Sequence, residues 1–387
     1  MRRNLSMMIK PSSSKCNLNC KYCFYNSISH NRNVKDYGFM CKETIGEIVK
    51  KAKEFCNGGI CTIGFQGGEP LLVGIDFYRH LVDEIEKNNN GTKFNLTIQT
   101  NGTLINKEWA SFFKDYNFLV GVSLDGIEEV NDLNRVNYKG NGTFHRIMRG
   151  IEFLKKYHVE FNILTVVTEE LSNRIQECYE FYKSSGFRYI QFITYLNALE
   201  ENEMVANRNP LTPKKYGEFL IELFNMWYRD VKNNNYISIR FFDNILSLFL
   251  GYEYEACEMR GICSCQNIIE SDGSVFPCDF YTYEKYSVGN ILKENFKDIL
   301  EKQKTMDFIK GSINSIDKCH SCKYNVVCRG GCRRRREDRK NFNYLCESYY
   351  KFYDYSFCKF RELATLQHEC IEHSHKHTPD MHHLHSH

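Results

Sequence analysis

Residues 12–26 read SSSKCNLNCKYCFYN and place three cysteines, Cys16, Cys20 and Cys23, on one short loop. A structural zinc ion or an ordinary iron–sulfur cluster takes four protein ligands, so this loop is one ligand short. Either a distant residue completes a zinc site, or the three cysteines hold three irons of a four-iron cluster. In the second case the fourth iron is open to a molecule that is not protein. The spacing alone leaves both possibilities open.

The composition describes a globular chain of 387 residues with 18 cysteines. Its net charge of +3 is too small to indicate a nucleic acid or a membrane surface as partner. The N-terminus lacks an apolar run long enough for a signal peptide, and no stretch reaches the length of a transmembrane helix. We therefore expect a cytoplasmic protein, without membrane or nucleic-acid partners, whose clustered cysteines bind metal.

Short apolar runs alternate with amphipathic helical stretches between residues 5 and 250. This alternation predicts an α/β fold with a parallel sheet and helical crossovers. Six such units suit a partial (β/α)6 barrel better than a closed barrel of eight. One helix is expected over residues 42–55 and another near 75–88, with a helix-rich bridge over 213–250. The expected strands are 5–10, 61–65, 94–100, 118–124, 161–167 and 189–194.

Beyond residue 250 this alternation is lost, and nine cysteines fall between Cys257 and Cys346. Residues 267–281 form one clear hairpin, with Asp272-Gly273 at its turn. A region with so little apolar periodicity is expected to be held together by metal. We therefore expect a barrel domain at 1–250, an irregular cluster-bound domain at 251–357, and a C-terminal extension at 358–387. Its last twenty residues are rich in histidine, and we expect the extension to be disordered.

The loop CNLNCKYC (residues 16–23), with Phe24 behind it, resembles the signature of the radical S-adenosylmethionine (SAM) superfamily. GFQGGEP (64–70) falls where that superfamily has its GGE motif, at the end of the second strand. The resemblance implies that SAM binds the open iron and is cleaved to a 5′-deoxyadenosyl radical. Close approach of the backbone to the SAM amino group would then favour glycine. Taken alone, GGEP could be an ordinary strand-to-helix turn.

The second domain resembles the SPASM type, which holds two auxiliary [4Fe-4S] clusters, so three [4Fe-4S] clusters and SAM are the implied cofactors. The resemblance assigns one auxiliary cluster to Cys257, Cys263, Cys278 and Cys332, and the other to Cys319, Cys322, Cys328 and Cys346. Two zinc sites would need the same number of ligands. The remaining cysteines have no partner motif, and most are expected to be small buried apolar residues; they are Cys41, Cys56, Cys61, Cys178, Cys265, Cys358 and Cys370.

Further motifs narrow the resemblance to the anaerobic sulfatase-maturating enzymes, from about Met7 to Phe357. The motifs are KPSSSKCNLNCKYCFY (10–25), HNRNVKDYGFM (30–40), IQTNGTL (98–104), SLDG (123–126), CQNIIESDGSVFPCDFY (265–281) and CRGGCRRRRE (328–337). The resemblance implies that SAM is bound by Tyr25, Gly68, Ser123, Arg135 and Leu196, and that Asp279 is the catalytic base. In the alternative interpretation, Asp279 is a hydrogen-bond acceptor at the end of the hairpin.

The implied reaction oxidises a cysteine or serine of a sulfatase to Cα-formylglycine. The adenosyl radical removes a hydrogen from the substrate Cβ, a base takes the thiol or hydroxyl proton, and one electron leaves through the auxiliary clusters. Asp279 directly follows Cys278, so base and electron exit would be neighbours. The implied partners are an unfolded or nascent sulfatase segment and an electron donor such as a flavodoxin or ferredoxin.

Two other functions remain open. The first is another SPASM-type peptide maturase, such as a thioether-forming one; many of those carry a leader-binding domain before the barrel, for which a cysteine loop at residue 16 leaves no room. The second is a non-catalytic iron–sulfur or zinc protein, which would need neither the three-cysteine loop nor the SAM-side motifs.

Four consecutive arginines, Arg333 to Arg336, follow Cys332. The plainest interpretation is a solvated helix start. Alternatively, the arginines offset the negative charge of a four-thiolate cluster or pair with acidic residues. The sequence leaves both open.

Overall fold

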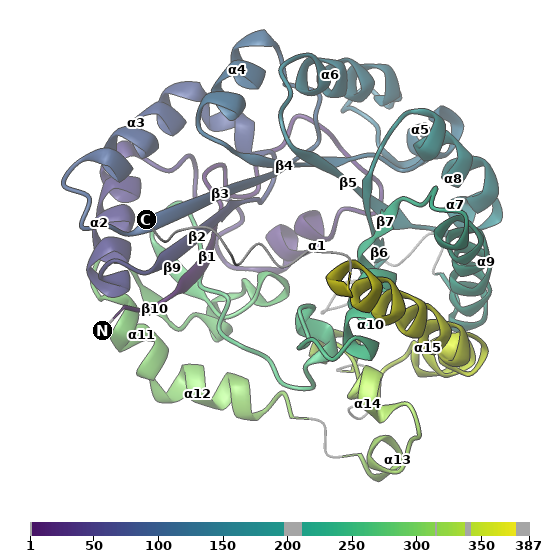
Figure 1. Cartoon of the computed structure of the whole chain (residues 1–387). Coiled ribbons are helices and arrows are strands. Elements are labelled where there is room, and N and C mark those ends of the chain that lie inside the picture. Colours follow the sequence, from purple (N-terminus) through teal and green to yellow (C-terminus); the bar gives the residue numbers. More distant parts are fainter. Residues whose placement is uncertain (1, 197–210, 314–315, 337–341, 377–387) are drawn as a thin grey trace, which may run out of the picture.

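The computed structural model describes residues 2–196, 211–313, 316–336 and 342–376. Its centre is one ten-stranded sheet in the order β10-β9-β8-β1-β2-β3-β4-β5-β6-β7. Figure 1 shows this sheet curving inside a ring of helices, with β10 and β7 as its edge strands. The predicted α/β fold with a partial barrel is confirmed.

The six predicted strands are present and pair in sequence order, each parallel to the next. They are β1 (Leu5–Ile9), β2 (Ile60–Phe65), β3 (Lys93–Thr100), β4 (Leu119–Ser123), β5 (Phe161–Val167) and β6 (Tyr189–Thr194). Parallel neighbours need long crossovers, and helices fill them. These are α1 (Phe24–Asn31), α2 (Lys42–Cys56), α3 (Ile75–Glu86), α4 (Lys107–Asp115), α5 (Glu128–Asn134), α6 (Phe144–Lys156), α7 (Glu169–Asn173) and α8 (Ile175–Ser184).

The main core lies between the sheet and these outer helices. Helix α2 shows why: its residues Ile45, Ile48, Val49 and Ala52 recur at helical spacing and are all buried. On β2 the buried residues alternate with half-exposed ones that face the inside of the curved sheet. The carboxyl ends of the parallel strands therefore meet at one end of the barrel, where we expect the functional residues.

The cysteine-rich region joins the same sheet. Strands β8 (Ile268–Ile269) and β9 (Ser274–Phe276) form the predicted hairpin, and its turn holds Gly273 at φ +83°. Strand β8 pairs in parallel with β1, through Met8 with Ile268 and Ile9 with Ile269. Strand β10 (Gly289–Asn290) completes this side, and β7 (Ser238–Ile239) extends the other. The local sequence pattern did not predict that the two regions share a sheet.

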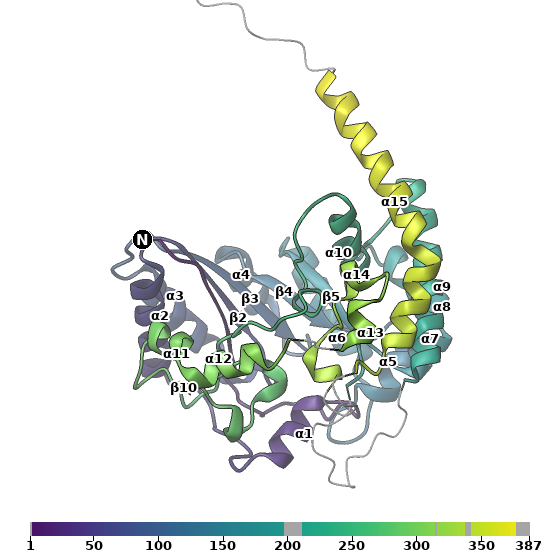
Figure 2. The same ribbon diagram turned by 90° about the horizontal axis from the view of Figure 1, so that it is seen from below.

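The remaining helices lie towards the C-terminus. The predicted bridge consists of α9 (Pro213–Lys232) and α10 (Arg240–Phe249). Figures 1 and 2 show short helices in this part of the chain, with α11 and α12 on the side of β10 and with α13 and α14 nearer to α15. These are α11 (Phe296–Glu301), α12 (Gln303–Lys310), α13 (Asp317–His320) and α14 (Asn325–Cys328). No helix within the described residues is both long enough and apolar enough to cross a membrane.

Helix α15 (Cys346–Lys376) differs from the expectation for the C-terminus (Figure 2). It runs unbroken across the expected boundary at residue 358, and Phe360, Leu363 and Ala364 are buried. Phe360 packs on Phe224 of α9 at a ring-centroid distance of 4.8 Å. The expectation that the extension is disordered is therefore wrong as far as Lys376, because apolar residues at helical spacing keep α15 against α9. Residues 377–387 lie outside the described residues.

Candidate active site at the carboxyl ends of the strands

The three-cysteine loop connects β1 to α1. Cys23 is the N-cap of α1, and its backbone N–H donates to the Cys20 carbonyl at 3.2 Å. Burial raises the pKa of Cys16 to about 12 and that of Cys20 to about 11, and the Cys23 thiol raises both pKa values further. A cationic metal centre is what would hold three such thiols as thiolates. The three cysteines of this loop are therefore suited to holding a metal cluster.

Gly68 of the GGE motif lies directly against this loop. The backbone N–H groups of Gly68 and Glu69 donate to the carbonyls of Ser13 and Lys15 at 2.9 and 2.7 Å. A Cβ atom on Gly68 would lie 2.0 Å from the Lys15 carbonyl oxygen. The glycine is therefore required by the close passage of the cysteine loop, a reason that the sequence did not reveal.

Glu69 ties the same loop to the end of β3. Its carboxylate is fully buried and accepts hydrogen bonds from Thr100 Oγ1 at 2.7 Å and from the Asn101 N–H at 2.8 Å. Burial raises the pKa of Glu69 to about 7. Asn101 Nδ2 in turn donates to Asn17 Oδ1 at 2.8 Å and lies 3.8 Å from Cys16 Sγ. The IQTNGTL motif thus supports the cysteine loop from the third strand.

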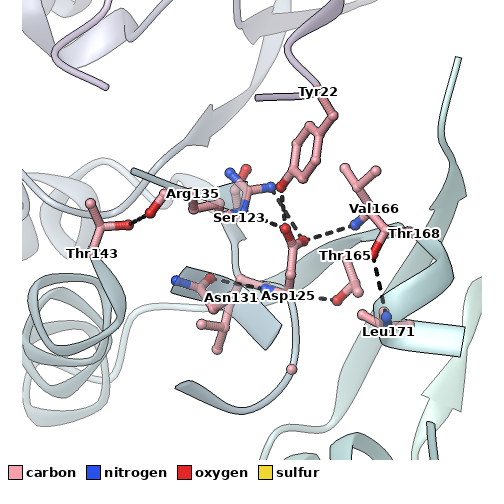
Figure 3. A network of polar contacts seen from close by, with 12 residues as sticks. Tyr22, Ser123, Asp125, Asn131, Arg135, Thr143, Thr165, Val166, Thr168 and Leu171 are labelled. Carbon is pink, nitrogen blue, oxygen red and sulfur yellow. Dashed lines mark hydrogen bonds and ion pairs between the residues drawn. The ribbon is translucent and has the colours of Figure 1, made fainter. Parts of the chain in front are cut away.

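Ser123 and Arg135 lie at the ends of β4 and α5, and Figure 3 shows both near the carboxylate of Asp125. Arg135 Nε donates to Asp125 Oδ2 at 3.0 Å, and Tyr22 of the cysteine loop donates its hydroxyl to the same oxygen. Tyr22 and Asp125 were missed as site residues, although both belong to the quoted motifs. Leu196 follows β6 and is half-buried, at the end of a described segment.

Asp279 follows Cys278 and is almost fully buried. Its Oδ1 lies 2.8 Å from Lys10 Nζ, and its Oδ2 accepts the Tyr25 hydroxyl at 2.5 Å. Burial raises the pKa of Tyr25 well above its usual value, so the phenol stays a donor. Tyr25, expected beside SAM, is thus in direct contact with the expected base.

Behind Lys10 lies a second buried carboxylate, Glu270. Its Oε1 is 3.9 Å from Lys10 Nζ and 2.6 Å from Arg32 Nη1. These linked charged residues, Arg32, Glu270, Lys10 and Asp279, are each at least nine-tenths buried. They join β1 and α1 of the barrel to the β8–β9 hairpin. Lys10 and Arg32 were also missed, because a charged residue in a loop ordinarily indicates solvent exposure.

The other cysteines of the second region fall into two groups. The thiols of Cys257, Cys263, Cys278 and Cys332 interact electrostatically within one group, and those of Cys319, Cys322, Cys328 and Cys346 within the other. Burial raises the pKa of Cys257 and that of Cys328 to about 12. No three or more His, Cys, Asp or Glu side chains of the described residues are arranged as a site for a single metal ion.

The cysteines without a motif have no common environment. Cys56, Cys61 and Cys178 are buried as small apolar residues, as expected. Cys41 and Cys358 are exposed, Cys265 is half-buried, and the side chain of Cys370 is outside the described part of the chain.

The arginine run is not a solvated helix start. Arg334 and Arg336 are buried, and Arg333 Nη1 donates to the Phe308 carbonyl at 2.9 Å. Arg335 Nη1 lies 2.5 Å from Glu258 Oε2, and its Nη2 donates to Thr194 Oγ1 of β6 at 2.7 Å. Arg335 thus pairs with an acidic residue, which is the alternative interpretation that the sequence left open.

Comparison with known proteins agrees with this site. The family model of the radical SAM superfamily matches residues 11–182, and that of the SPASM iron-sulfur cluster-binding domain matches residues 257–323. A cysteine-type anaerobic sulfatase-maturating enzyme of Clostridium novyi is 43% identical over 94% of this chain and 98% of its own. A serine-type enzyme of Bacteroides thetaiotaomicron is 29% identical over 91% of this chain and 89% of its own.

Solved structures give the same result. The native enzyme anSMEcpe, with bound AdoMet and the Cp18Cys peptide, has a TM-score of 0.89 at 41% identity and covers 94% of this chain and 100% of that one. Streptococcus suis SuiB bound to its precursor peptide SuiA shares the fold, with a TM-score of 0.61 at 18% identity, covering 88% of this chain and 75% of that one. The chain belongs to the anaerobic sulfatase-maturating enzymes of the radical SAM superfamily.

Proposed function

We propose that this protein oxidises a cysteine of a sulfatase polypeptide to Cα-formylglycine. The observation that carries the proposal is the position of Asp279. This buried carboxylate directly follows Cys278, a proposed cluster ligand, and it is held by Lys10 and Tyr25 of the KPSSSKCNLNCKYCFY motif. The choice of cysteine is supported by the greater identity to relatives named cysteine-type, 43% against 29% for a serine-type relative. Those names describe the relatives, and the proposal extends them to this chain.

The proposed cofactors are SAM and three [4Fe-4S] clusters. Cys16, Cys20 and Cys23 would hold the first cluster, and the two thiol groups of the second region would hold the others. Each set contains a thiol whose pKa is raised by burial, such as Cys16, Cys257 or Cys328, and such a thiol needs a cationic centre to ionise. When bound, SAM and its cluster supply the radical that removes a hydrogen from the substrate.

The residues proposed for SAM surround the first cluster loop. Arg135 engages Asp125 through Nε and Nη2, which leaves Nη1 for an anionic group such as a carboxylate. Ser123 accepts from Gln99 Nε2 at 3.1 Å and keeps its own hydroxyl proton to donate. Tyr25, Gly68 and Leu196 complete the proposed set.

In this proposal Asp279 takes the proton of the substrate thiol. Lys10 and Tyr25 each engage one of its oxygens, which fixes the carboxylate plane and leaves one lone pair on each oxygen for an incoming donor. Because Asp279 adjoins Cys278, the proton acceptor and the proposed electron acceptor are neighbours in the chain.

The test is Asp279→Asn in the anaerobically reconstituted enzyme with a cysteine-containing sulfatase peptide. A positioned base contributes about 10²–10⁴-fold, so formylglycine formation should fall by at least about 100-fold. SAM cleavage to 5′-deoxyadenosine should continue. Asp272→Asn, in the exposed turn of the same hairpin, is the matched control. An unchanged rate of peptide oxidation, followed by mass, would exclude Asp279 as the base.

Two further variants test the cofactor and the substrate. Replacing Cys16, Cys20 and Cys23 together by Ala should abolish SAM cleavage while leaving the two auxiliary clusters in place. A peptide with serine at the reactive position should be oxidised more slowly than its cysteine counterpart. Equal rates for the two peptides would contradict the cysteine preference.

For the electron donor we propose a flavodoxin or ferredoxin, and for the location the cytoplasm. The location is supported by the cysteines of the described residues, which are free thiols of the kind that a reducing compartment preserves. Reduction of the enzyme by a purified flavodoxin, compared with dithionite, tests the donor. If dithionite supports SAM cleavage and the purified flavodoxin supports none, flavodoxin is not the electron donor.

A further inference from the structure

Asp125 is a buried carboxylate on which parts of three strand–helix units meet. It follows β4 in the SLDG motif and is 2% exposed. Its Oδ1 accepts the Val166 N–H of β5 at 2.9 Å, and its Oδ2 accepts Arg135 Nε at 3.0 Å and the Tyr22 hydroxyl. As a fourth donor, Arg135 Nη2 lies 3.5 Å from Asp125 Oδ1 (Figure 3). Four donors thus converge on one side chain.

The backbone of Asp125 is fixed in turn by α5. Its N–H donates to Asn131 Oδ1 at 3.2 Å, and Asn131 Nδ2 donates to Asp132 Oδ1 at 2.8 Å. Asp132 Oδ1 also accepts the Thr143 N–H at 2.8 Å. The carboxylate therefore has little freedom to follow either of its two side-chain partners, and each partner is instead fixed to it.

The two side-chain partners come from the two components of the SAM site. Tyr22 lies between Cys20 and Cys23, so its hydroxyl fixes the cysteine loop. Arg135 is the proposed anion-binding residue, and its guanidinium lies 5.4 Å from the centre of the Tyr22 ring. The Asp125 carboxylate thus sets the distance between the cysteine loop, which is proposed to hold the cluster, and the Arg135 guanidinium, which is proposed to face SAM.

We propose that Asp125 and Tyr22 are positioning residues that hold the cysteine loop and the Arg135 guanidinium in register for SAM. This proposal rests on the proposed function, since it assumes that the site binds SAM. It assigns a role to the Tyr22 hydroxyl in particular, which a phenylalanine at this position could not fill. Neither residue is proposed to touch the reacting atoms.

The test compares Tyr22→Phe and Asp125→Asn with a matched pair elsewhere in the fold. Tyr179 Oη donates to Asp230 Oδ2 at 2.9 Å, and Lys183 Nζ pairs with the same oxygen at 2.5 Å. Tyr179→Phe and Asp230→Asn therefore remove the same chemistry, a buried tyrosine–aspartate–cation contact, away from the cysteine loop. All variants are reconstituted anaerobically, and iron content and melting temperature are recorded first.

The main measurement is SAM affinity, read from the electron paramagnetic resonance signal of the reduced loop cluster as SAM is added. Hydrogen bonds to charged groups predict a weakening of about tenfold or more for Asp125→Asn, and a smaller one for Tyr22→Phe. Iron content should stay intact in Tyr22→Phe. Steady-state assays should show a raised KM for SAM with a smaller change in kcat. The two control variants should match the wild type in SAM affinity.

The double variant Tyr22→Phe/Asp125→Asn separates positioning from independent contributions. If the hydroxyl acts through Asp125, the double variant binds SAM no more weakly than Asp125→Asn alone. Independent, multiplying losses would overturn the proposal, and so would a SAM affinity in Tyr22→Phe equal to that of Tyr179→Phe. Failure of the wild-type enzyme to bind SAM would instead refute the proposed function.

Discussion

Glu270→Gln is predicted to destabilise the protein strongly, although Glu270 is not among the residues proposed to bind a cluster, SAM or the substrate. The carboxylate is 1% exposed and faces two buried cations, Arg32 at 2.6 Å and Lys10 at 3.9 Å. At an effective dielectric constant of 20 the closer pair alone is worth about 6 kcal/mol before desolvation is counted. Glutamine keeps the shape and removes the charge, so Arg32 is left without its carboxylate.

Removing one partner of a buried ion pair costs about 3–5 kcal/mol, because the other charge stays buried. Unfolding entropy near 2.1 cal/mol/K per residue gives about 0.8 kcal/mol/K for a chain of 387 residues. The melting temperature of the reconstituted enzyme should therefore fall by about 4–6 °C. Differential scanning calorimetry at a fixed scan rate measures this shift.

The matched control is Glu255→Gln. Glu255 pairs with Arg240 at 3.0 Å, but the side chains of both are about half exposed or more. An exposed pair contributes at most about 1 kcal/mol, so the control should shift the melting temperature by about 1 °C or less. Equal shifts in the two variants would show that the buried chain of charges contributes nothing special, and the reasoning would fail.

Three other changes have defined outcomes. Burial raises the pKa of Asp243 to about 6, so the folded state binds the proton more tightly than the unfolded chain, and stability falls as pH rises from about 4 through 6. Asp243→Asn should therefore stabilise the protein by about 3 kcal/mol at pH 8 and by little at pH 4, measured as melting temperature at both pH values; a gain independent of pH would contradict this. Gly68→Ala should displace the cysteine loop and cost about four irons per chain, whereas Gly46→Ala, whose new Cβ would meet nothing closer than 3.7 Å, should keep them all. Deleting residues 368–387 should preserve cluster content and peptide oxidation and lower retention on a nickel column; lost oxidation with intact iron would place the tail in the active machinery.

Local patterns in the sequence predicted the six parallel strands, the hairpin and the position of the three-cysteine loop. Alternating apolar runs determine strand and helix directly, because each element must bury one face. These features depend on residues close together in the chain, or on a motif with few alternative arrangements. The resemblance to the SPASM type, and not the spacing of the cysteines alone, supplied the assignment of eight cysteines to two groups, and that assignment stays a prediction.

The polar contacts could not be predicted in the same way. Lys10 and Asp279 are 269 positions apart, and nothing in either motif says that they pair. Tyr22 and Asp125 are each typical of a loop, and only the fold brings the hydroxyl to the carboxylate. Arg335 belongs to a run that indicates solvent exposure, yet it reaches Thr194 at the end of β6. Long-range pairing of buried charges leaves no periodic signal.

The helix at the C-terminus was missed for a different reason. The histidine-rich composition of the last twenty residues outweighed the apolar positions that precede it. Phe360, Leu363 and Ala364 continue the spacing of Phe352 and keep α15 helical beyond the expected boundary.

Because β8 pairs with β1, the barrel and the cluster region are not exchangeable modules. The Lys10 N–H donates to the Ile269 carbonyl at 2.8 Å, and the Met8 N–H to the Asn267 carbonyl at 3.2 Å. A fragment ending near residue 250 would expose this strand edge as a template for aggregation and leave Lys10 without both of its carboxylates. Chimeras between related enzymes should therefore fold only when both halves of the shared sheet come from the same parent, or when the β1–β8 seam is transplanted with its buried charges.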